Sequence, residues 1–346
     1  MTAGKRMAAL STLWARKRPE VGATPHDVVF HENKWRLLRY RGQGNAAVGV
    51  GARHRVPVVL IPSLINRHYV LDLSPGRSFA EDMVKRGHDV FIIDWGTPTD
   101  EDRFITFDDV ADGIIARALR VATKLSGSEQ VHVLGYCLGG TLAVIHAARH
   151  PERIRSLVAL AAPVRFRDEG LLSAWTQTKS FDLRALVEAM GNVPWQLMQS
   201  AFQMLRPTLN AAKVVQLVDR VWDDEFMDGF LAIETWGNDN VSFPGACYER
   251  YVDALYRKDA LVKGEFSLSG KVVRLEDITA PTMAITFEHD HIVPWKSASV
   301  LVERVSSKEK LHEHLSGGHV GAVISKKAAA TLWPKISAFW AAHDAN

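Results

Sequence analysis

Three residues have the types and the order needed for nucleophilic acyl chemistry: Cys137, Asp290 and His319. Cys137 lies in Gly-Tyr-Cys-Leu-Gly at positions 135–139, a spacing typical of a strained strand-to-helix turn that exposes a nucleophile. The residues two positions from the nucleophile must be small in such a turn, and here both are glycine. A thiolate at Cys137 would attack an acyl carbon, His319 would accept the thiol proton, and Asp290 would orient the imidazole and stabilise the imidazolium. We predict that the three form a catalytic triad.

Stabilisation of an oxyanion would require backbone donors near Cys137. Leu138 would be the first residue of the helix after the turn, so its N–H points toward the place where an oxyanion would form. The helix N-terminus also adds partial positive charge, which favours a thiolate. The second donor should come from the loop after the strand that ends at Ile61. We predict Ile65 for this role, with Leu64 and Asn66 as the alternatives.

Other acids and histidines compete with the predicted triad. Asp290 follows an apolar run that predicts a strand, and the choice of this carboxylate over its neighbours rests on that register. The flanking alternatives are Glu288, His289 and His291. His132, His146 and His314 lie in predicted strands or a predicted helix, where a packed or surface role is expected. Of the 14 histidines, His319 is the one in a glycine-flanked loop after the last predicted strand.

These three residues can lie close together if they follow parallel strands of one sheet, because the carboxyl ends of such strands lie at the same edge. Short apolar runs rich in β-branched residues predict buried strands, and the amphipathic segments between them predict helices. The predicted strands are 58–61, 89–94, 131–134, 154–160, 281–287 and 311–315, preceded by a strand, turn and strand at 28–40. The predicted helices are 78–86, 107–125, a segment ending at 150, and 326–342. This alternation predicts an α/β fold with a mostly parallel central sheet and helices on both faces.

The alternation is interrupted once, and the interruption divides the chain. We assign residues 28–163 and 280–346 to the α/β core, 164–279 to a mostly helical cap inserted before the strand that carries the acid, and 1–27 to an N-terminal segment. The N-terminal segment forms either an amphipathic surface helix or a frayed terminus, and it lacks the apolar stretch of a signal peptide. The insertion is rich in tryptophan. Trp175, near its start, is a candidate neighbour of the active site, unless the tryptophans form the core of the cap itself.

Composition excludes several classes of protein. Lys+Arg 42 against Asp+Glu 39 gives a net charge of +3, which is too small to indicate a nucleic-acid partner. Cys137 and Cys247 are the only cysteines, so a disulfide scaffold is excluded and a reducing cytoplasm is expected. No run approaches the roughly 20 apolar residues of a transmembrane helix. No group of His, Cys and carboxylate residues has metal-ligand spacing, and the triad chemistry requires no metal or other cofactor.

The segment around Cys137 and several others resemble polyhydroxyalkanoate (poly-3-hydroxybutyrate) synthases, most closely the class III catalytic subunit, within the α/β-hydrolase superfamily. The resemblance extends from about residue 55 to the C-terminus. The matching segments are PSLINRHYVLDL at 62–73, RS at 77–78, FIIDWG at 91–96, DRF at 102–104, GYCLGG at 135–140, LLSAW at 171–175, DHIVP at 290–294 and GGHVG at 317–321. Residues 238–247, within the insertion, depart from the family pattern.

The resemblance implies a transferase that polymerises (R)-3-hydroxyacyl-CoA, with 3-hydroxybutyryl-CoA as the expected substrate, and releases CoA. Cys137 would carry the acyl group as a thioester, His319 would be its base, and Asp290 would also help to activate the substrate hydroxyl. His291 matches the histidine after the family's acid, which has no settled role. The CoA thioester is then the substrate and not a cofactor. The family further implies an accessory synthase subunit, a homo- or hetero-oligomer, and a place at the surface of cytoplasmic polyester granules.

Two other classes of protein remain open at this point. A cysteine-dependent hydrolase of the same fold (a thioesterase, a polyester depolymerase or a dienelactone hydrolase) would share the turn around Cys137, although dienelactone hydrolases lack the long insertion. A non-catalytic granule-associated homologue would share the fold but would not need an intact triad.

Overall fold

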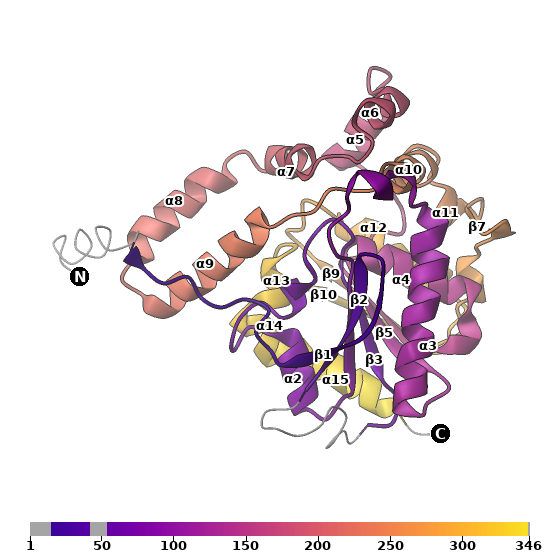
Figure 1. Cartoon of the computed structure of the whole chain (residues 1–346), viewed down its shortest axis with the longest axis horizontal. Helices are drawn as coiled ribbons and strands as arrows, with labels where there is room; N and C mark the ends of the chain where they lie inside the picture. Colours follow the sequence, from indigo (N-terminus) through magenta and orange to yellow (C-terminus); the bar gives the residue numbers. More distant parts are fainter. Residues whose placement is uncertain (1–14, 42–53, 345–346) are drawn as a thin grey trace.

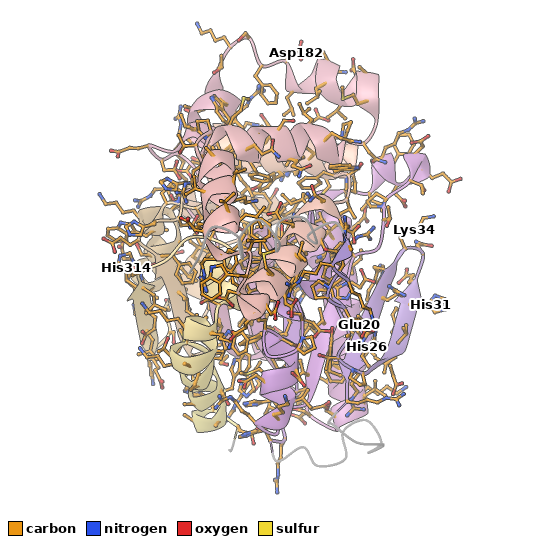
Figure 2. The ribbon with its side chains drawn as sticks, turned by 90° about the vertical axis from the view of Figure 1, so that its left-hand side faces the viewer. Glu20, His26, His31, Lys34, Asp182 and His314 are labelled. Carbon is orange, nitrogen blue, oxygen red and sulfur yellow. The ribbon has the colours of Figure 1, made fainter. Side chains whose placement is uncertain are left out.

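The centre of the molecule is a mostly parallel β-sheet, as the sequence predicts. The computed structural model describes residues 15–41 and 54–344, and the eight strands of the sheet within them are ordered β1-β2-β4-β3-β5-β6-β9-β10. The strands are β1 (His26–Glu32), β2 (Trp35–Tyr40), β3 (Val58–Ile61), β4 (Val90–Asp94), β5 (Val131–Tyr136), β6 (Ile154–Leu160), β9 (Thr282–Phe287) and β10 (Lys310–Leu315). β2 is antiparallel to both of its neighbours, and the other neighbouring pairs are parallel. β1 and β10 are the two edges, and Figure 2 shows His314 of β10 and His26 of β1 on opposite sides of the molecule.

Helices cover both faces of this sheet (Figure 1). The helices around it are α2 (Phe79–Lys85), α3 (Ile115–Ser126), α4 (Leu138–Arg149), α12 (Trp295–Arg304), α13 (Gly321–Ile324), α14 (Lys326–Thr331) and α15 (Trp333–Ala342). Alternate residues of β3 point to opposite faces. Val59 and Ile61 pack in the same core as α3 and α4, whereas Val58 and Leu60 pack with α2 and α15. Strands buried on both faces explain why the sequence shows continuous apolar runs rather than alternation.

Two helical segments differ from the sequence prediction. The single helix expected over 326–342 is divided into α14 and α15. Pro334 lies in the first turn of α15, where its missing N–H interrupts the hydrogen bonding of a continuous helix. The helix expected over 107–125 begins with the π-helical turn η4 (Asp109–Ile114) and continues as α3. Neither difference moves the strands that carry the predicted triad.

The inserted segment consists of an arm and a part that packs on the core. The arm contains α5 (Leu171–Gln177), α6 (Leu183–Met190), α7 (Trp195–Met204), α8 (Leu209–Arg220) and α9 (Asp224–Asn238), which extend away from the sheet (Figure 1). The later elements are α10 (Gly245–Arg250), η6 (Tyr251–Arg257), α11 (Ala260–Lys263), β7 (Ser267–Leu268) and β8 (Lys271–Val272). Cys247, Leu255 and Phe266 of this later part are buried in the same core as α3 and α4. The arm is anchored on the core at Leu183 of α6 and Trp236 of α9, and between these points it exposes Val215 and Trp222.

The N-terminal segment can be followed only in part. The helix considered for it falls mainly on residues 1–14, outside the described residues. Arg16 pairs with Asp224 (2.9 Å) and Asp228 (3.0 Å), which joins the described start of the chain to α9. Among the residues that the structure describes, no helix combines the length and the apolar character needed to span a membrane.

Two buried histidines at the amino ends of the strands predict how stability depends on pH. His88 and His132 are 3% and 0% exposed, and both rings contact Trp340. Burial, together with the neighbouring positive charges of His54 on His88 and of His88 on His132, lowers the pKa of each to about 3. Between about pH 6.5 and 3 the unfolded chain therefore binds protons that the folded chain does not bind. The free energy of unfolding should consequently fall as the pH falls below about 6.5.

Denaturant unfolding between about pH 6.5 and 4.5 measures this effect. The free energy of unfolding should fall by on the order of 2 kcal/mol per pH unit when both histidines contribute to this slope. His132→Gln should remove part of it, whereas the control His314→Gln, at an exposed position on β10, should leave it unchanged. Equal slopes in the two variants would show that other groups cause the acid sensitivity.

Candidate active site

Cys137 occupies a strained turn between β5 and α4. Its backbone has φ 55° and ψ −127°, a conformation that costs a non-glycine residue on the order of 1–3 kcal/mol. Glycines make the turn possible, because a Cβ at Gly135 would overlap the backbone of Gly140. A Cβ at Gly139 would likewise overlap the carbonyl oxygen of Ile61 at the end of β3. The predicted arrangement of strand, nucleophile and helix is therefore present.

Gly139→Ala is expected to disturb this turn. Because the added Cβ would overlap backbone atoms, which cannot rotate away, we expect a loss of stability of about 1–3 kcal/mol. The same displacement would move Cys137 and the Leu138 amide, so acyl transfer should fall by at least about 100-fold.

Denaturant unfolding and CoA release measure the two effects of Gly139→Ala. The matched control is Gly237→Ala in α9, where an added Cβ meets nothing within 4 Å. A Gly139→Ala chain with the stability and the turnover of the control would contradict this account of the turn.

Asp290 and His319 form the charged part of the site. Asp290 follows β9 and His319 follows β10, so two neighbouring parallel strands bring them together at their carboxyl ends. His319 Nδ1 lies 2.7 Å from Asp290 Oδ2, and both side chains are almost completely buried. Asp290 Oδ1 accepts the N–H groups of Ile292 (2.9 Å) and Val293 (2.8 Å). The carboxylate is thus held in one orientation, with one oxygen directed at the imidazole.

Further contacts hold the two loops that carry this pair. The His289 N–H donates to the Gly317 carbonyl at 2.9 Å, which joins the loop after β9 to the loop after β10. The Tyr136 hydroxyl donates to the His319 carbonyl at 3.3 Å, and the centroids of the two rings lie 5.2 Å apart. His319 is therefore fixed by its backbone as well as by its imidazole.

The Cys137 sulfur lies close enough to the imidazole of His319 to interact with it, so the three groups follow one another in a chain. Burial alone would lower the pKa of His319, but the charge of Asp290 and the sulfur of Cys137 outweigh burial and raise the pKa above its usual value. These interactions favour a protonated imidazole that faces both the Asp290 side chain and the Cys137 sulfur. The arrangement has the geometry of an activated nucleophile with its base and the orienting group of that base.

The competing residues do not reach this chain of contacts. Asp290 is 7% exposed, whereas its neighbours are exposed. Those exposed neighbours are Glu288, His289 and His291. The other candidate histidines, His132, His146 and His314, hydrogen-bond to Ser156, to the Ala111 carbonyl and to Thr286. The structure thus brings together the three residues that the sequence singled out, and their catalytic roles stay predictions.

The predicted oxyanion donors lie on two adjoining segments. Leu138 is the first residue of α4, so its N–H is among those that have no acceptor within the helix. Gly139 lies against the carbonyl oxygen of Pro62, which brings the start of α4 against the loop after β3. Ile65 in this loop is buried, and its carbonyl accepts the Val241 N–H at 3.5 Å. The N–H of Ile65 remains our prediction for the second donor.

The loop after β3 is also joined to the end of the arm. Arg67 Nε lies 3.0 Å from Asp239 Oδ1, and the Tyr69 hydroxyl donates to Asp239 Oδ2 at 2.7 Å. Trp236 Nε1 donates to the Arg67 carbonyl at 3.0 Å. The arm and the loop that contains Ile65 are therefore mechanically connected.

Sequence reasoning missed an aromatic wall beside Cys137, formed by Phe166, Tyr251 and Tyr256. The rings of Tyr251 and Tyr256 on η6 lie 5.4 Å apart, and the pKa values of both are raised by burial and also by the nearby Cys137 sulfur. The Phe166 ring packs edge-on against both, with centroid distances of 5.9 Å and 5.0 Å. A signal was available, because Tyr248, Tyr251 and Tyr256 account for three of the chain's 6 tyrosines.

Trp175 and His291, the two other predicted neighbours of the site, border this wall. Trp175 is half-buried on α5, which packs against η6. His291 is exposed and lines a small hollow together with Phe166 and Tyr256. His291 therefore lies beside the aromatic residues, and Trp175 lies on a helix that packs against η6; neither belongs to the triad.

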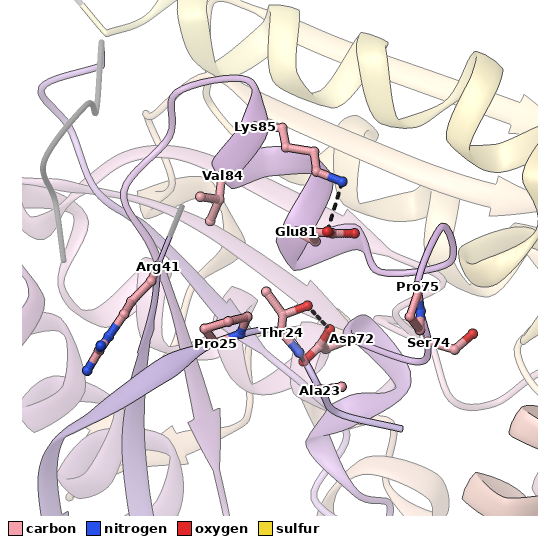
Figure 3. A pocket seen from close by; sticks show the side chains of 10 residues that line it. All are labelled: Ala23, Thr24, Pro25, Arg41, Asp72, Ser74, Pro75, Glu81, Val84 and Lys85. Carbon is pink, nitrogen blue, oxygen red and sulfur yellow. Dashed lines mark hydrogen bonds and ion pairs between the residues drawn. The ribbon is translucent and has the colours of Figure 1, made fainter. Parts of the chain in front are cut away.

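A second hollow lies between the segment before β1 and α2 (Figure 3). Its polar groups are already paired: the Thr24 hydroxyl donates to Asp72, and Lys85 Nζ lies 2.8 Å from Glu81 Oε1. Burial raises the pKa of Asp72. None of the described residues that line it belongs to the predicted triad. We interpret this hollow as a junction between the start of the described chain and the loop before α2.

Comparison with protein families gives two matches. Residues 56–323 match the alpha/beta hydrolase fold, and residues 18–83 match the N-terminus of poly-beta-hydroxybutyrate polymerase (PhaC). The chain is 33% identical over 323 residues to the poly(3-hydroxyalkanoate) polymerase subunit PhaC of Haloferax mediterranei, covering 93% of this chain and 64% of the relative. It is 33% identical over 319 residues to the protein of the same name from Allochromatium vinosum, covering 92% of this chain and 88% of the relative.

Solved structures support the fold. The monoacylglycerol lipase of Paleococcus ferrophilus has a TM-score of 0.53 and 18% identity, covering 85% of this chain and 96% of that chain. At this level of identity the likeness concerns the arrangement of the sheet and helices and says nothing about substrate.

Proposed function

This chain belongs to the poly(3-hydroxyalkanoate) polymerase family, and from that membership we propose that it transfers (R)-3-hydroxyacyl groups from CoA to a growing polyester. The proposed substrate is 3-hydroxybutyryl-CoA. The observation that carries the proposal is the contact of His319 with both Cys137 and Asp290 at the carboxyl ends of β5, β9 and β10.

In the first step, the Cys137 thiolate attacks the thioester carbonyl of the acyl-CoA. A bond forms between the carbonyl carbon and Cys137 Sγ, the bond to the CoA sulfur breaks, and His319 gives its proton to the departing thiolate. The N–H groups of Leu138 and Ile65 would stabilise the oxyanion between these events. Because one thioester replaces another, the exchange is close to thermoneutral and the acyl group stays activated.

In the second step, the hydroxyl at the end of the growing chain attacks the thioester on Cys137. His319 accepts the hydroxyl proton, the oxoester bond forms, and the thiolate of Cys137 is released. Asp290 has one oxygen bonded to His319 and the other to two backbone N–H groups, which favours action on the hydroxyl through His319. Conversion of a thioester to an oxoester is downhill and drives chain growth.

Water competes with the hydroxyl for the thioester, so a polymerase needs an enclosed, apolar site. The aromatic wall supports such a site on one side of Cys137. The arm, connected through Asp239 to the loop after β3, is the candidate cover for the other side. We propose that the arm limits the access of water while the acyl group is bound to Cys137.

The relatives are named as polymerase subunits, which supports a partner for this chain. We propose that it acts with an accessory synthase subunit in an oligomer at the surface of polyester granules. The apolar residues that the arm exposes, among them Val214, Val215 and Trp222, are the candidate contact surface.

Incubation of the chain with (R)-3-hydroxybutyryl-CoA tests the proposed function. CoA release is followed with a thiol reagent in withdrawn aliquots, and turbidity and free hydroxybutyrate are measured in parallel. We expect CoA release with rising turbidity and little free acid, because the thioester is transferred to a hydroxyl rather than to water. Release that yields mainly free acid would indicate a thioesterase. Absence of release even after addition of a class III accessory subunit would contradict the proposal.

A further inference from the structure

Three potential metal ligands gather at the end of α4 that is distant from Cys137. Asp112 on η4, His146 on α4 and His150, the residue that follows α4, each place one ligand atom within 4.8 Å of the others. They line a hollow that also includes Ser269. Between Cys137 and His146 the helix rises about 14 Å at 1.5 Å per residue, so this hollow is separate from the triad.

The two histidines lie close together at the C-terminal end of α4, His146 in its last turn and His150 directly after it. They are four residues apart, and their ring centroids lie 4.7 Å from each other. His146 Nδ1 lies 2.8 Å from the Ala111 carbonyl oxygen, which fixes the ring and leaves the lone pair of Nε2 for another partner. Histidines that bind metals usually donate their other N–H to a carbonyl or carboxylate in this way.

Asp112 is held in place from two sides. Its Oδ1 lies 2.6 Å from His150 Nε2, and its Oδ2 accepts the Ser269 hydroxyl at 2.6 Å. Ser269 lies in the turn between β7 and β8, and its N–H donates to Asp108 at 2.9 Å. The π-helical turn η4 presents Asp112, and such turns are frequent at functional sites. A metal ion could replace the proton between Asp112 and His150. For His146 to bind the same ion, its ring would have to move slightly closer to the other two residues.

We propose that Asp112, His146 and His150 bind a divalent transition-metal ion of the zinc class. Two imidazole nitrogens and one carboxylate oxygen suit such ions, and the open hollow lets water take the fourth position. The charged residues that line the hollow, besides the histidines, are Asp108, Asp109, Asp112, Glu152, Arg117, Arg120 and Arg153. The acids outnumber the arginines, and Arg117 Nε is paired with Glu32 at 3.0 Å. The ion joins η4 to α4 and, through Ser269, to the β7–β8 turn, so it stabilises the core and takes no part in acyl transfer.

The test uses the full chain carrying Cys137→Ser, because the triad is itself a Cys-His-Asp group that binds zinc-class ions readily. Equilibrium dialysis against Zn²⁺ should give about one bound ion per chain. His150→Gln and Asp112→Asn, at partly exposed positions, should each weaken binding by at least about 10-fold. His314→Gln, on the exposed edge strand, should bind as the parent does.

Two further readouts accompany the dialysis. Titration with Co²⁺ should produce visible bands of nitrogen and oxygen ligation that are lost in His150→Gln. At the same Zn²⁺ concentration, Tm should rise by several degrees in the parent and by less in the two variants. Binding that does not saturate, or an affinity that both variants leave unchanged, would overturn the proposal. No acyl-CoA is present in these measurements, so their outcome is independent of the polymerase activity.

Discussion

Replacement of Cys137 by serine is expected to reduce CoA release from (R)-3-hydroxybutyryl-CoA by at least about 10⁴-fold and to leave the fold intact. One atom changes, at a partly exposed position, so packing is hardly altered. A serine hydroxyl is not ionised by the imidazole of His319 in the resting state, and the activated thioester intermediate would become an oxoester. Transfer from that oxoester to a chain hydroxyl would no longer be downhill. Steady-state CoA release and circular dichroism of the same preparation measure the two properties.

The matched control for this variant is Cys247→Ser. Cys247 is fully buried in the core with α3 and α4, and burial raises the pKa of its thiol, so it should react poorly with thiol reagents. Turnover by Cys247→Ser should stay within about twofold of the parent, apart from a modest loss of stability. Near-normal turnover by Cys137→Ser, or loss of thiol labelling in Cys247→Ser alone, would mean that the nucleophile has been misassigned.

Asp290→Asn is expected to reduce CoA release by about 10³- to 10⁴-fold. The amide oxygen would take the position of Oδ1, because that position faces the N–H groups of Ile292 and Val293. The amide NH₂ would then face His319 Nδ1, which would have to accept a hydrogen bond. His319 would carry its proton on Nε2, where it could not accept one from Cys137. The positions of the three side chains would be preserved, but His319 would be in the tautomer that cannot act as a base toward Cys137.

Loss of the carboxylate should also change the pH dependence of Cys137 alkylation. Asp290 is among the groups that raise the pKa of His319, so in Asp290→Asn the imidazole should lose its proton at a lower pH than in the parent. The protonated partner that stabilises the thiolate would then be absent at neutral pH, and alkylation of Cys137 by iodoacetamide should slow.

Glu288→Gln is the control for the acid, since it makes the same chemical change two positions away at an exposed residue. Its turnover and its alkylation profile should match those of the parent. If Glu288→Gln loses activity and Asp290→Asn retains it, the assignment of the acid is wrong.

The strands and the triad could be predicted because they depend on local sequence. The run at 58–61 is apolar, β-branched and bracketed by prolines, and β3 has those bounds. Gly135 and Gly139 are required by backbone contacts within the turn that they define. Asp290 was preferred to Glu288 from strand register, and the structure buries Asp290 whereas Glu288 is exposed.

The features that could not be predicted depend on contacts between distant parts of the chain. The cluster of tyrosines around Tyr251 is visible in the sequence, but it does not indicate that Tyr251 lies beside Cys137. The contact of Asp239 with Arg67 joins the arm to the loop after β3 and has no local pattern. Asp112 is likewise far in sequence from His146 and His150, so the spacing of the potential ligands did not suggest a metal site.

Two sequence predictions were inaccurate although the sequence near each residue contained relevant information. Pro334 lies within the stretch expected to be one helix, and it marks the break between α14 and α15. The tryptophans of the insertion were treated as one group, yet Trp222 is 47% exposed and Trp236 is 7% exposed. Trp236 packs in the core with residues of α2 and α15, and its indole N–H donates to the Arg67 carbonyl, a partner that the sequence does not reveal.

The central claim is that Cys137 carries the acyl chain, and identification of the acylated residue tests it most directly. The chain is mixed with (R)-3-hydroxybutyryl-CoA, quenched in acid after a short time, and analysed by intact mass and peptide mapping. The account predicts one or more hydroxybutyryl units on the peptide that contains Cys137, released by neutral hydroxylamine as a thioester would be, and absent from Cys137→Ser. CoA release with the acyl group on another residue, or with no covalent adduct at any time point, would contradict it.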